Sequence, residues 1–450
     1  MPRMVHPMSE FRDMRISLVT ETFHPEINGV SMTLGRLVEG LAKRGHLVHV
    51  VRCRRPREVP LVIPAGVTHS AFPSLPIPHY QGLRLGLPAR GRLRELWSRE
   101  RPDLVHVATE GPLGRSALLA AHDLGLPISS SYHTNFHEYS RHYGCGILHG
   151  MVERYLRTFH NRTRVTMVPS PDVLEQLSAA GYLNLTTLGR GVDTTLFNPA
   201  KRDQHLRAEW GAGPQDPVFL HVGRVAPEKN IPLALAAFRR IQVVQPHARM
   251  VVVGDGPLRS RLAATHPTVH FTGELPINKL TQHYASADVF LFPSMSETFG
   301  NVVLEACASG LATVSFNYAA PKTYIRPGDN GLLAPFGDEA AWLTQACALA
   351  VEPMSIDRMR RRARSTAENI GWDAVIDRFE LLLRRAADPQ YTFSEPSSRL
   401  HVIPLACQLN ARQRDPGLDI TPTLATARTL TRTLTQAKRM PHAHQQPLPF

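Results

Sequence analysis

The chain has 450 residues, of which 43% are hydrophobic and 20% are charged, and this composition is typical of a globular protein in water. At roughly 100–200 residues per domain, the length predicts two or three domains. Basic residues exceed acidic ones by 13, mostly within residues 1–200, and this favours anionic partners such as phosphates, nucleic acid or an acidic membrane surface. Residues 1–13 have no apolar core, and no apolar run reaches about 18 residues, so we expect neither a signal peptide nor a transmembrane helix.

The cysteines indicate a reducing compartment. They are odd in number and widely spaced, without a CxxC pair, at Cys53, Cys145, Cys307, Cys347 and Cys407. Such thiols are typical of a cytoplasmic protein in which they act as small buried apolar groups. We therefore expect a cytoplasmic protein, with any membrane contact being peripheral, on the inner face of the cell membrane.

In the first half of the chain, short apolar runs alternate with helical patterns. The expected strands lie at 14–21, 46–52, 104–108, 127–133 and 163–170, and the clearest helices at 30–45 and 116–125. The glycine-containing loop FHPEINGVS separates the first strand from the first helix. This alternation predicts an α/β fold with a parallel sheet.

The same alternation starts again in the second half. The expected strands lie at 217–224, 248–256, 269–274, 288–294 and 311–316, with helices at 231–241, 258–264, 280–287 and 301–310. Two successive α/β runs predict two doubly wound, Rossmann-like domains, 14–200 and 201–387. An amphipathic helix at 371–387 closes the second run, and the Pro-, Thr- and Gln-rich tail 388–450 is expected to be disordered.

A pair of cations follows the first strand of the second half, in the loop HVGRVAPEKN. Arg224 and Lys229 stand five residues apart, just beyond the carboxyl end of that strand. Open α/β sheets bind ligands at this edge. Two cations there can hold a diphosphate and neutralise the charge that develops as it leaves, although a surface loop with ordinary charges would have the same sequence.

A glycine pair flanks Asp255 at the end of the next strand, in VVVGDGPLRSRL. Gly254 and Gly256 would allow the backbone to approach a ligand closely, but turns of this kind are common. We place Gly254 and Asp255 among the candidate donor-binding residues.

Two acids, Glu297 and Glu305, are separated by seven intervening residues in SMSETFGNVVLEACASG. Gly300 and Asn301 stand at the expected start of the helix, where backbone N–H groups can face a phosphate. Glu305 lies within the apolar run VVLEACA, which is a costly place for a charge without a partner. A carboxylate there is suited to accept hydrogen bonds from ribose hydroxyls.

The first half contributes a glycine loop and a histidine. The loop with Gly29 offers backbone donors but contains no GxGxxG, so a dinucleotide fingerprint is absent. His133 follows a strand in SSSYHTNF, and strand-end histidines are often structural. The spacing of His137, His142 and His149 does not match a zinc site, and we expect no metal.

Four segments, in this order, resemble the large glycosyltransferase family 4, the group 1 glycosyl transferases with the GT-B fold. They are TETFHPEINGVS, SYHTNF, GRVAPEKN and the E-x7-E segment SMSETFGNVVLEACASG, within residues 14–385. The first two look closest to bacterial GDP-mannose-dependent α-mannosyltransferases and to glycolipid synthases of the sulfoquinovosyl diacylglycerol type. The tail lies outside the resemblance.

The resemblance implies a role for each matching position. Arg224 and Lys229 correspond to the diphosphate-binding pair, and Glu305 to the ribose-binding carboxylate. Glu297 corresponds to the acid near the hydroxyls of the donor sugar, and His133 to the histidine that contacts this sugar near the reacting centre. Gly29 falls in the loop that approaches the donor phosphates.

The resemblance also implies the organisation and chemistry of the enzyme. The first domain would take the acceptor and the second the nucleotide sugar, with the last helix returning to the first domain around a central cleft. The reaction would transfer a hexose with retention, from GDP-mannose or a UDP-hexose to a lipid, lipid-linked or saccharide acceptor in glycolipid or cell-envelope glycan synthesis. No cofactor or essential metal is expected, because the cationic pair can replace magnesium.

Other functions remain open on the sequence. A sugar-nucleotide 2-epimerase shares the architecture but needs no acceptor, and a catalytically inactive membrane-associated scaffold would share the fold. A nucleic-acid-binding protein would suit the charge, but no recognition motif or basic-aromatic stripe supports one. The Arg-rich segments Arg92–Arg101 and Val152–Arg164 would suit an anionic membrane surface, or else are ordinary packing helices.

Overall fold

The structure is a computed structural model and describes residues 12–26, 28–55, 63–77, 84–133, 146–351 and 353–390. All of these residues belong to one compact unit, Met1–Ser398. Of the predicted tail 388–450, residues 391–450 lie outside the described part, as do His137 and His142. The side chain of His149 also lies outside it.

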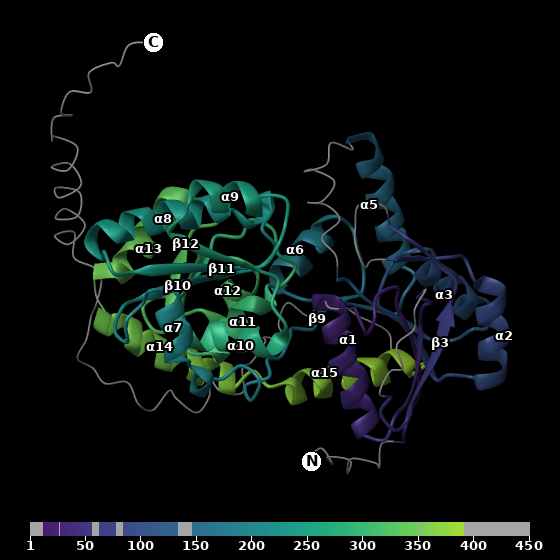
Figure 1. Cartoon of the computed structure of the whole chain (residues 1–450). Coiled ribbons are helices and arrows are strands. Elements are labelled where there is room, and N and C mark those ends of the chain that lie inside the picture. The colour runs from purple at the N-terminus through teal and green to yellow at the C-terminus, as the bar shows by residue number, and fades with distance from the viewer. Residues whose placement is uncertain are drawn as a thin grey trace, which may run out of the picture. The chain divides into compact units, whose positions relative to one another are not determined.

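Two parallel sheets organise the described residues (Figure 1). The first runs in the order β3-β2-β1-β6-β7-β8-β9 and the second in the order β12-β11-β10-β13-β14-β15. The first sheet consists of β1 (Arg15–Val19), β2 (Leu47–Cys53), β3 (Val67–Phe72), β6 (Leu104–Val107), β7 (Ile128–Ser131), β8 (Val165–Val168) and β9 (Leu185–Thr187). The second consists of β10 (Val218–Val222), β11 (Arg249–Val253), β12 (Val269–Gly273), β13 (Val289–Phe292), β14 (Ala312–Phe316) and β15 (Gly331–Ala334). A small antiparallel pair, β4 (Ser74–Pro76) and β5 (Arg84–Gly86), accompanies the first sheet.

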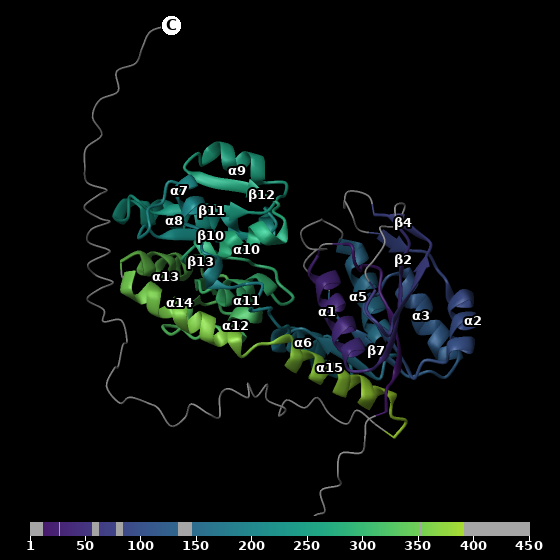
Figure 2. The same cartoon turned by 60° about the horizontal axis from the view of Figure 1, so that its bottom comes forward.

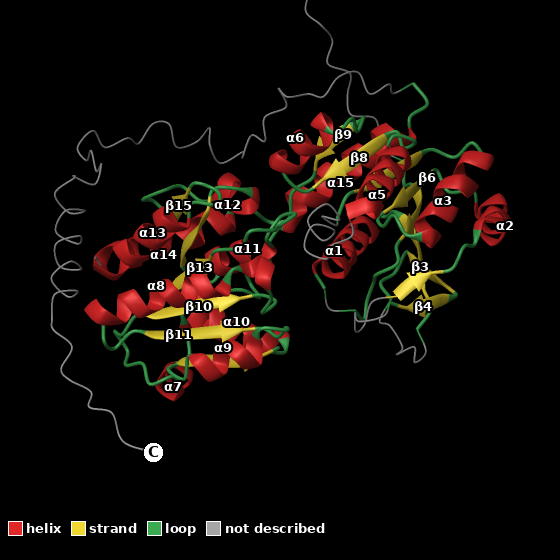
Figure 3. Cartoon of the chain, turned by 90° about the horizontal axis from the view of Figure 1, so that it is seen from above, coloured by secondary structure: helices red, strands yellow, loops and turns green. Residues whose placement is uncertain are grey.

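Helices cover both sheets (Figure 3). The first sheet and its helices form the first lobe, with α1 (Gly29–Lys43), α2 (Arg90–Glu100), α3 (Pro112–Asp123), α5 (Gly146–His160) and α6 (Pro171–Ala179). The second lobe holds the short helices η1 (Pro199–Lys201), α7 (Gln204–Glu209) and η2 (Pro227–Lys229). Its other helices are α8 (Ile231–Val244), α9 (Arg259–Thr265), α10 (Ile277–Ser286), α11 (Asn301–Ala308), α12 (Ala319–Tyr324), α13 (Glu339–Val351) and α14 (Pro353–Glu368). The last helix is α15 (Trp372–Ala387).

The two strand orders explain why the central strands are apolar throughout. Each sheet extends from its first strand in one direction and then in the other, so helices pack on both of its faces. In β10, Phe219 packs into one core, and Val218, Leu220 and Val222 pack into the core on the opposite face. Strands buried on both faces read as continuous apolar runs, as they do here.

The last helix, α15, packs against α1 of the first lobe (Figure 2). Its buried residues Ile376 and Phe379 share a core with Leu37 of α1. A β-carbon placed on Gly40 would lie 2.3 Å from Cδ1 of Ile376, so the helices meet at a position that requires glycine. The chain therefore returns to the first lobe after completing the second.

The predicted α/β fold with two Rossmann-like domains is confirmed, and each expected strand overlaps an observed one. The edge strands β3, β9 and β15 were not predicted from the sequence. These strands are short or only partly buried, so they lack the continuous apolar run that marks a central strand. Among the described helices, none has the length and hydropathy needed to cross a bilayer.

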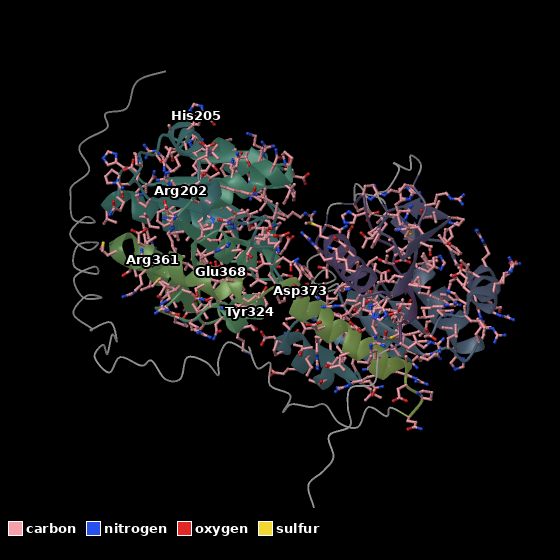
Figure 4. The ribbon with its side chains drawn as sticks, turned by 90° about the horizontal axis from the view of Figure 1, so that it is seen from below. Arg202, His205, Tyr324, Arg361, Glu368 and Asp373 are labelled. Carbon is pink, nitrogen blue, oxygen red and sulfur yellow. The ribbon has the colours of Figure 1, made fainter. Side chains whose placement is uncertain are left out.

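One buried carboxylate holds three elements onto the amino-terminal edge of the second sheet. Asp288, directly before β13, accepts the backbone N–H of Val218 at 2.9 Å. It also pairs with Arg202 at 2.9 Å, Arg207 at 3.1 Å and Arg360 at 2.9 Å. The Arg207 side chain is fully buried, and Arg202 is labelled in Figure 4. Without this carboxylate, desolvated guanidinium groups would face one another.

We expect Asp288→Asn to lower the free energy of unfolding by about 3–5 kcal/mol, because it leaves buried charge without its counter-ion. Urea denaturation measures this loss. The matched control is Asp329→Asn, which removes an exposed pair with Arg362 at 3.4 Å and should cost at most about 1 kcal/mol. Equal effects of the two substitutions would contradict the structural role of Asp288.

Candidate active site

A cavity of about 500 Å³ lies where loops from both sheets converge. Its walls come from the loops that follow β1, β7 and β9 in the first lobe and β10 and β13 in the second. These loops leave the carboxyl ends of the strands, and β1/β6 and β10/β13 are the pairs at which each strand order reverses. Doubly wound sheets bind ligands at these switch points, so the topology places the cavity where a substrate is expected.

The first-lobe wall includes the amino terminus of α1. Asn28 caps this helix, because its Oδ1 accepts the backbone N–H of Ser31 at 2.9 Å, and its Nδ2 donates to Thr22 Oγ1 at 2.7 Å. Thr22 in turn donates to Glu26, which pairs with Arg55 at 2.6 Å. This chain of contacts fixes the loop that presents Gly29 at the cavity. The positive end of the helix dipole therefore lies at the cavity.

The cationic pair predicted from the sequence lies in the second-lobe wall. Arg224 and Lys229 both line the cavity, and Lys229 belongs to the short helix η2. The Lys229 ammonium pairs with Glu297, and it also donates to the Ser296 carbonyl at 3.3 Å. The Arg224 side chain is 40% exposed, and its guanidinium lies 3.8 Å from Glu228. Lys229 is thus held in place, while Arg224 remains accessible to a ligand.

The loop after β13 and the start of α11 complete this wall. Ser294 Oγ donates to Glu297 Oε1 at 2.9 Å, which holds the carboxylate that pairs with Lys229. Gly300 and Asn301 line the cavity at the amino terminus of α11. Asn301 Oδ1 is buried without a hydrogen-bond partner among the described residues. Its Nδ2 lies 3.5 Å from the position of a β-carbon on Gly29, so the two helix termini approach each other across the cavity.

His133 lies at the first-lobe side of the cavity, buried and 7% exposed. Its Nδ1 is 2.8 Å from a terminal nitrogen of Arg190, and its Nε2 has no partner among the described residues. Burial, the Arg190 cation, and His106 and His160 hold the pKa of His133 well below its usual value. The ring is therefore neutral at physiological pH. Burial also lowers the pKa of Arg190 to about 10, so its guanidinium remains charged at that pH.

Gly254 and Asp255 are not part of the cavity wall. A β-carbon on Gly254, at φ +131°, would lie 2.0 Å from the carbonyl oxygen of Gly223. One on Gly256, at φ +156°, would lie 2.5 Å from that of Val225. These glycines permit a close approach to the loop carrying Arg224. Asp255 accepts the N–H of Gly256 at 2.7 Å.

Glu305 lies within α11, behind the residues that line the cavity. Its Oε2 accepts a hydrogen bond from the Tyr284 hydroxyl at 2.9 Å. Burial raises the pKa of Glu305 to about 7, although the Tyr284 hydrogen bond opposes this shift. Among the described residues, Tyr284 is the side-chain hydrogen-bond partner of this acid, and no cation pairs with it.

The structure brings together most of the candidate residues around the cavity: Gly29, His133, Arg224, Lys229, Glu297, Gly300 and Asn301. Three cations, Arg190, Arg224 and Lys229, face it together with two acids, Glu228 and Glu297, and two helix amino termini. This charge distribution suits an anionic ligand with polar groups, such as a sugar diphosphate.

Arg190 and Thr22 line the cavity but were not singled out by sequence reasoning. Arg190 lies in LGRGVD, between β9 and η1, where no strand or helix pattern marks a site. The signal that could have identified Arg190 is its position as a charged residue just after a strand of the first sheet. Thr22 lies in the predicted N-terminal loop.

The two Arg-rich segments bury their apolar residues within the protein. In α2, Leu93 and Trp97 are buried, and in α5, Leu156 and Phe159 are buried. Both segments therefore contain packing helices whose core faces are already covered. Their exposed faces still carry arginines, including Arg94 of α2.

Comparisons with known proteins agree with this architecture. A family profile described as "Glycosyltransferase Family 4" matches residues 27–196, and one described as "Glycosyl transferases group 1" matches residues 216–351. The chain is 35% identical over 372 residues to a GDP-mannose-dependent alpha-mannosyltransferase of Mycolicibacterium smegmatis. That match covers 81% of this chain and 95% of the relative.

Two further similarities extend this result. The chain is 34% identical over 312 residues to sulfoquinovosyl transferase SQD2 of Arabidopsis thaliana, a match that covers 67% of this chain and 60% of the relative. Sucrose-phosphate synthase from Thermosynechococcus elongatus has a similar structure, with a TM-score of 0.68 and 18% identity. That match covers 83% of this chain and 98% of the synthase, and at this identity it bears on the fold alone.

The raised pKa of Glu305 predicts a pH-dependent effect of Glu305→Gln on stability in the absence of ligand. As pH rises from about 4.5 to about 7, the unfolded chain releases this proton before the folded protein does, so the wild type loses stability. We expect the free energy of unfolding of the variant, relative to wild type, to increase by about 2–3 kcal/mol between pH 5 and pH 8.

Urea denaturation of both proteins at the two pH values measures this difference. Glu21, whose pKa burial raises to about 7, is present in both proteins and its contribution cancels. A difference that does not change with pH would contradict a desolvated Glu305 carboxyl.

Proposed function

This chain is a glycosyltransferase of family 4, and we propose that it transfers a mannosyl group, or another hexose, with retention from a nucleotide sugar to a lipid, lipid-linked or saccharide acceptor. The observation that carries the proposal is the cavity in which Arg224 and Lys229 face the amino termini of α1 and α11. Cations and helix termini in one cavity are suited to bind a diphosphate and to stabilise it as it leaves.

GDP-mannose is the first donor we propose, with a UDP-hexose as the alternative. The mycolicibacterial relative, matched over 95% of its length, carries GDP-mannose dependence in its name. In this chain, Glu305 would accept hydrogen bonds from the ribose hydroxyls, and Glu297 and His133 would contact the sugar.

The leaving diphosphate would be neutralised by protein groups without a resident metal or other cofactor. Lys229 supplies a fixed ammonium, because Glu297 and the Ser296 carbonyl hold it. Arg224 supplies a more exposed guanidinium that can close on the phosphates. As the bond from C1 to the diphosphate oxygen lengthens, negative charge grows on that oxygen, and these cations stabilise the transition state more than the bound substrate.

Retention would follow from attack on the same face of the sugar from which the diphosphate departs. The acceptor hydroxyl oxygen forms the new bond to C1, and its proton passes to an oxygen of the leaving diphosphate. His133 is neutral with its Nδ1 already hydrogen-bonded, and Glu297 is paired with Lys229. Neither group is poised to take that proton, which supports a role for the diphosphate as the base.

We propose a lipid or lipid-linked acceptor, reached at the inner face of the cell membrane by a cytoplasmic protein. The exposed faces of α2 and α5 carry Arg94 and Arg154, and Met151 beside the latter is 60% exposed. Exposed arginines, one of them close in sequence to an exposed apolar residue, suit an anionic headgroup layer. The plant relative is named a sulfoquinovosyl transferase, and its similarity to this chain also supports a glycolipid acceptor.

The donor is tested first by a thermal-shift panel of GDP, UDP, ADP and their sugar conjugates. A ligand of the cavity at 100 times its Kd should stabilise the protein by about 2.7 kcal/mol. We expect GDP and GDP-mannose to do so, and Lys229→Ala to lose most of the shift. The control Lys43→Ala removes a lysine whose side chain is 73% exposed and should keep the shift. A shift with UDP alone would show that the donor base is uracil rather than guanine. The absence of a shift with any nucleotide would overturn the proposal.

The acceptor is tested by incubating the protein with radiolabelled GDP-mannose and vesicles of anionic or neutral lipid. We expect label in the lipid fraction, with more product on anionic vesicles because the exposed arginines face their headgroups. An altered sugar nucleotide formed without any acceptor would identify an epimerase. Nucleotide binding without turnover would identify an inactive scaffold, and product that is independent of vesicle charge would overturn the membrane proposal.

A further inference from the structure

We propose that Arg190 is a positioning residue, which fixes His133 so that its Nε2–H points at an oxygen of the bound sugar nucleotide. The contact that carries the proposal joins a terminal nitrogen of Arg190 to His133 Nδ1 at 2.8 Å. Both residues line the cavity. The inference rests on the proposed function for its consequence in catalysis, but its structural part stands on this contact alone.

The direction of this hydrogen bond settles which ring nitrogen carries the proton. A guanidinium has only N–H donors and no acceptor, so Nδ1 must be the acceptor. A neutral imidazole that accepts at Nδ1 carries its hydrogen on Nε2. His133 therefore presents an N–H donor rather than a lone pair on its other side.

That donor is in need of a partner. His133 is only 7% exposed, and its Nε2 makes no hydrogen bond within the described part of the chain. Leaving a buried donor without a hydrogen bond is unfavourable, so a ligand oxygen in the cavity that accepts from Nε2–H would be bound more tightly. The proton on Nε2 also means that this nitrogen cannot accept the proton of the acceptor hydroxyl.

Arg190 is itself held by the connection between the lobes. Its second terminal nitrogen donates to the carbonyls of Leu188 at 3.1 Å and Gly189 at 3.3 Å, and the residue is 6% exposed. A β-carbon on Gly189 would lie 3.2 Å from the hydroxyl of Tyr324, on α12 of the second lobe (labelled in Figure 4). The guanidinium is thus fixed by its own backbone segment, and His133 is fixed by the guanidinium.

The charge of Arg190 supports the same role. Among the described residues, no carboxylate forms an ion pair with it, so its charge is not offset by a neighbouring acid. A cation at hydrogen-bond distance disfavours a second charge on the imidazole. His133 is kept as a neutral donor, which suits contact with a sugar hydroxyl or a phosphate oxygen.

Nitrogen NMR of the histidine rings tests the positioning directly, with protein labelled with 15N in histidine and no substrate added. The His133 signals are assigned by their loss in His133→Ala. We expect a proton on Nε2 in wild type and in Arg190→Lys, which retains a charged donor. We expect a mixed or Nδ1-protonated ring in Arg190→Met. The exposed Arg162→Met should keep the wild-type signals. A proton on Nδ1 in wild type would overturn the proposal, whether or not any variant folds.

Turnover of GDP-mannose tests the consequence through a double-mutant cycle. We expect Arg190→Met to lower kcat by about 10–100-fold, with KM changed by less than about threefold, because the donor is misplaced rather than lost from binding. Arg190→Lys should recover most of kcat. In the His133→Ala background, Arg190→Met should cost little more, whereas multiplicative losses would show that Arg190 acts independently and would overturn the proposal.

The two measurements separate the possible failures. If the expected ring protonation is found and no nucleotide sugar is turned over, the proposed function fails while the positioning by Arg190 stands. If the enzyme is active and Arg190→Met keeps the wild-type ring signals and kcat, the positioning fails while the function stands.

Discussion

The ion pair between Lys229 and Glu297 joins the two loops on which the candidate site depends. Lys229 follows β10 and Glu297 follows β13, and these adjacent strands flank the point where the order of the second sheet reverses. An ammonium that is already held need not be reorganised when a diphosphate arrives. The pair also keeps the Glu297 carboxylate beside the cavity, where it can accept hydrogen bonds from the hydroxyl groups of a sugar.

Close backbone packing supports this arrangement from behind. Gly254 and Gly256 let the loop after β11 lie directly against Gly223 and Val225, in the loop that carries Arg224. The contact includes a hydrogen bond from the N–H of Val225 to the carbonyl of Asp255, at 2.8 Å. Loops on parallel strands are held mainly by such contacts, because their own backbone groups have left the sheet ladder. The loop that carries Arg224 and Lys229 is therefore held in place by the loop after β11.

The first lobe contributes oriented donors rather than mobile charge. Asn28 and Thr22 order the start of α1, and Arg190 orders His133. Each of these residues hydrogen-bonds to a neighbour in its own lobe, so the donor directions are set before a substrate binds. The second lobe places Arg224 and Lys229 opposite them. A sugar diphosphate held between the two sets would have its phosphates and its sugar ring positioned independently.

The sequence by itself determined the α/β fold, its two Rossmann-like halves and most of the cavity wall. Continuous apolar runs identify strands buried on both faces, and the carboxyl ends of parallel strands meet at one edge, so Arg224, Lys229 and Glu297 could be placed from their positions alone. Only the tertiary structure decided which groups touch. It brought Arg190, in a segment without periodic pattern, to 2.8 Å from His133 across 57 positions of sequence, and it set Gly254 against the backbone of Gly223. Such contacts depend on how separate loops pack in space, which local residue patterns do not encode.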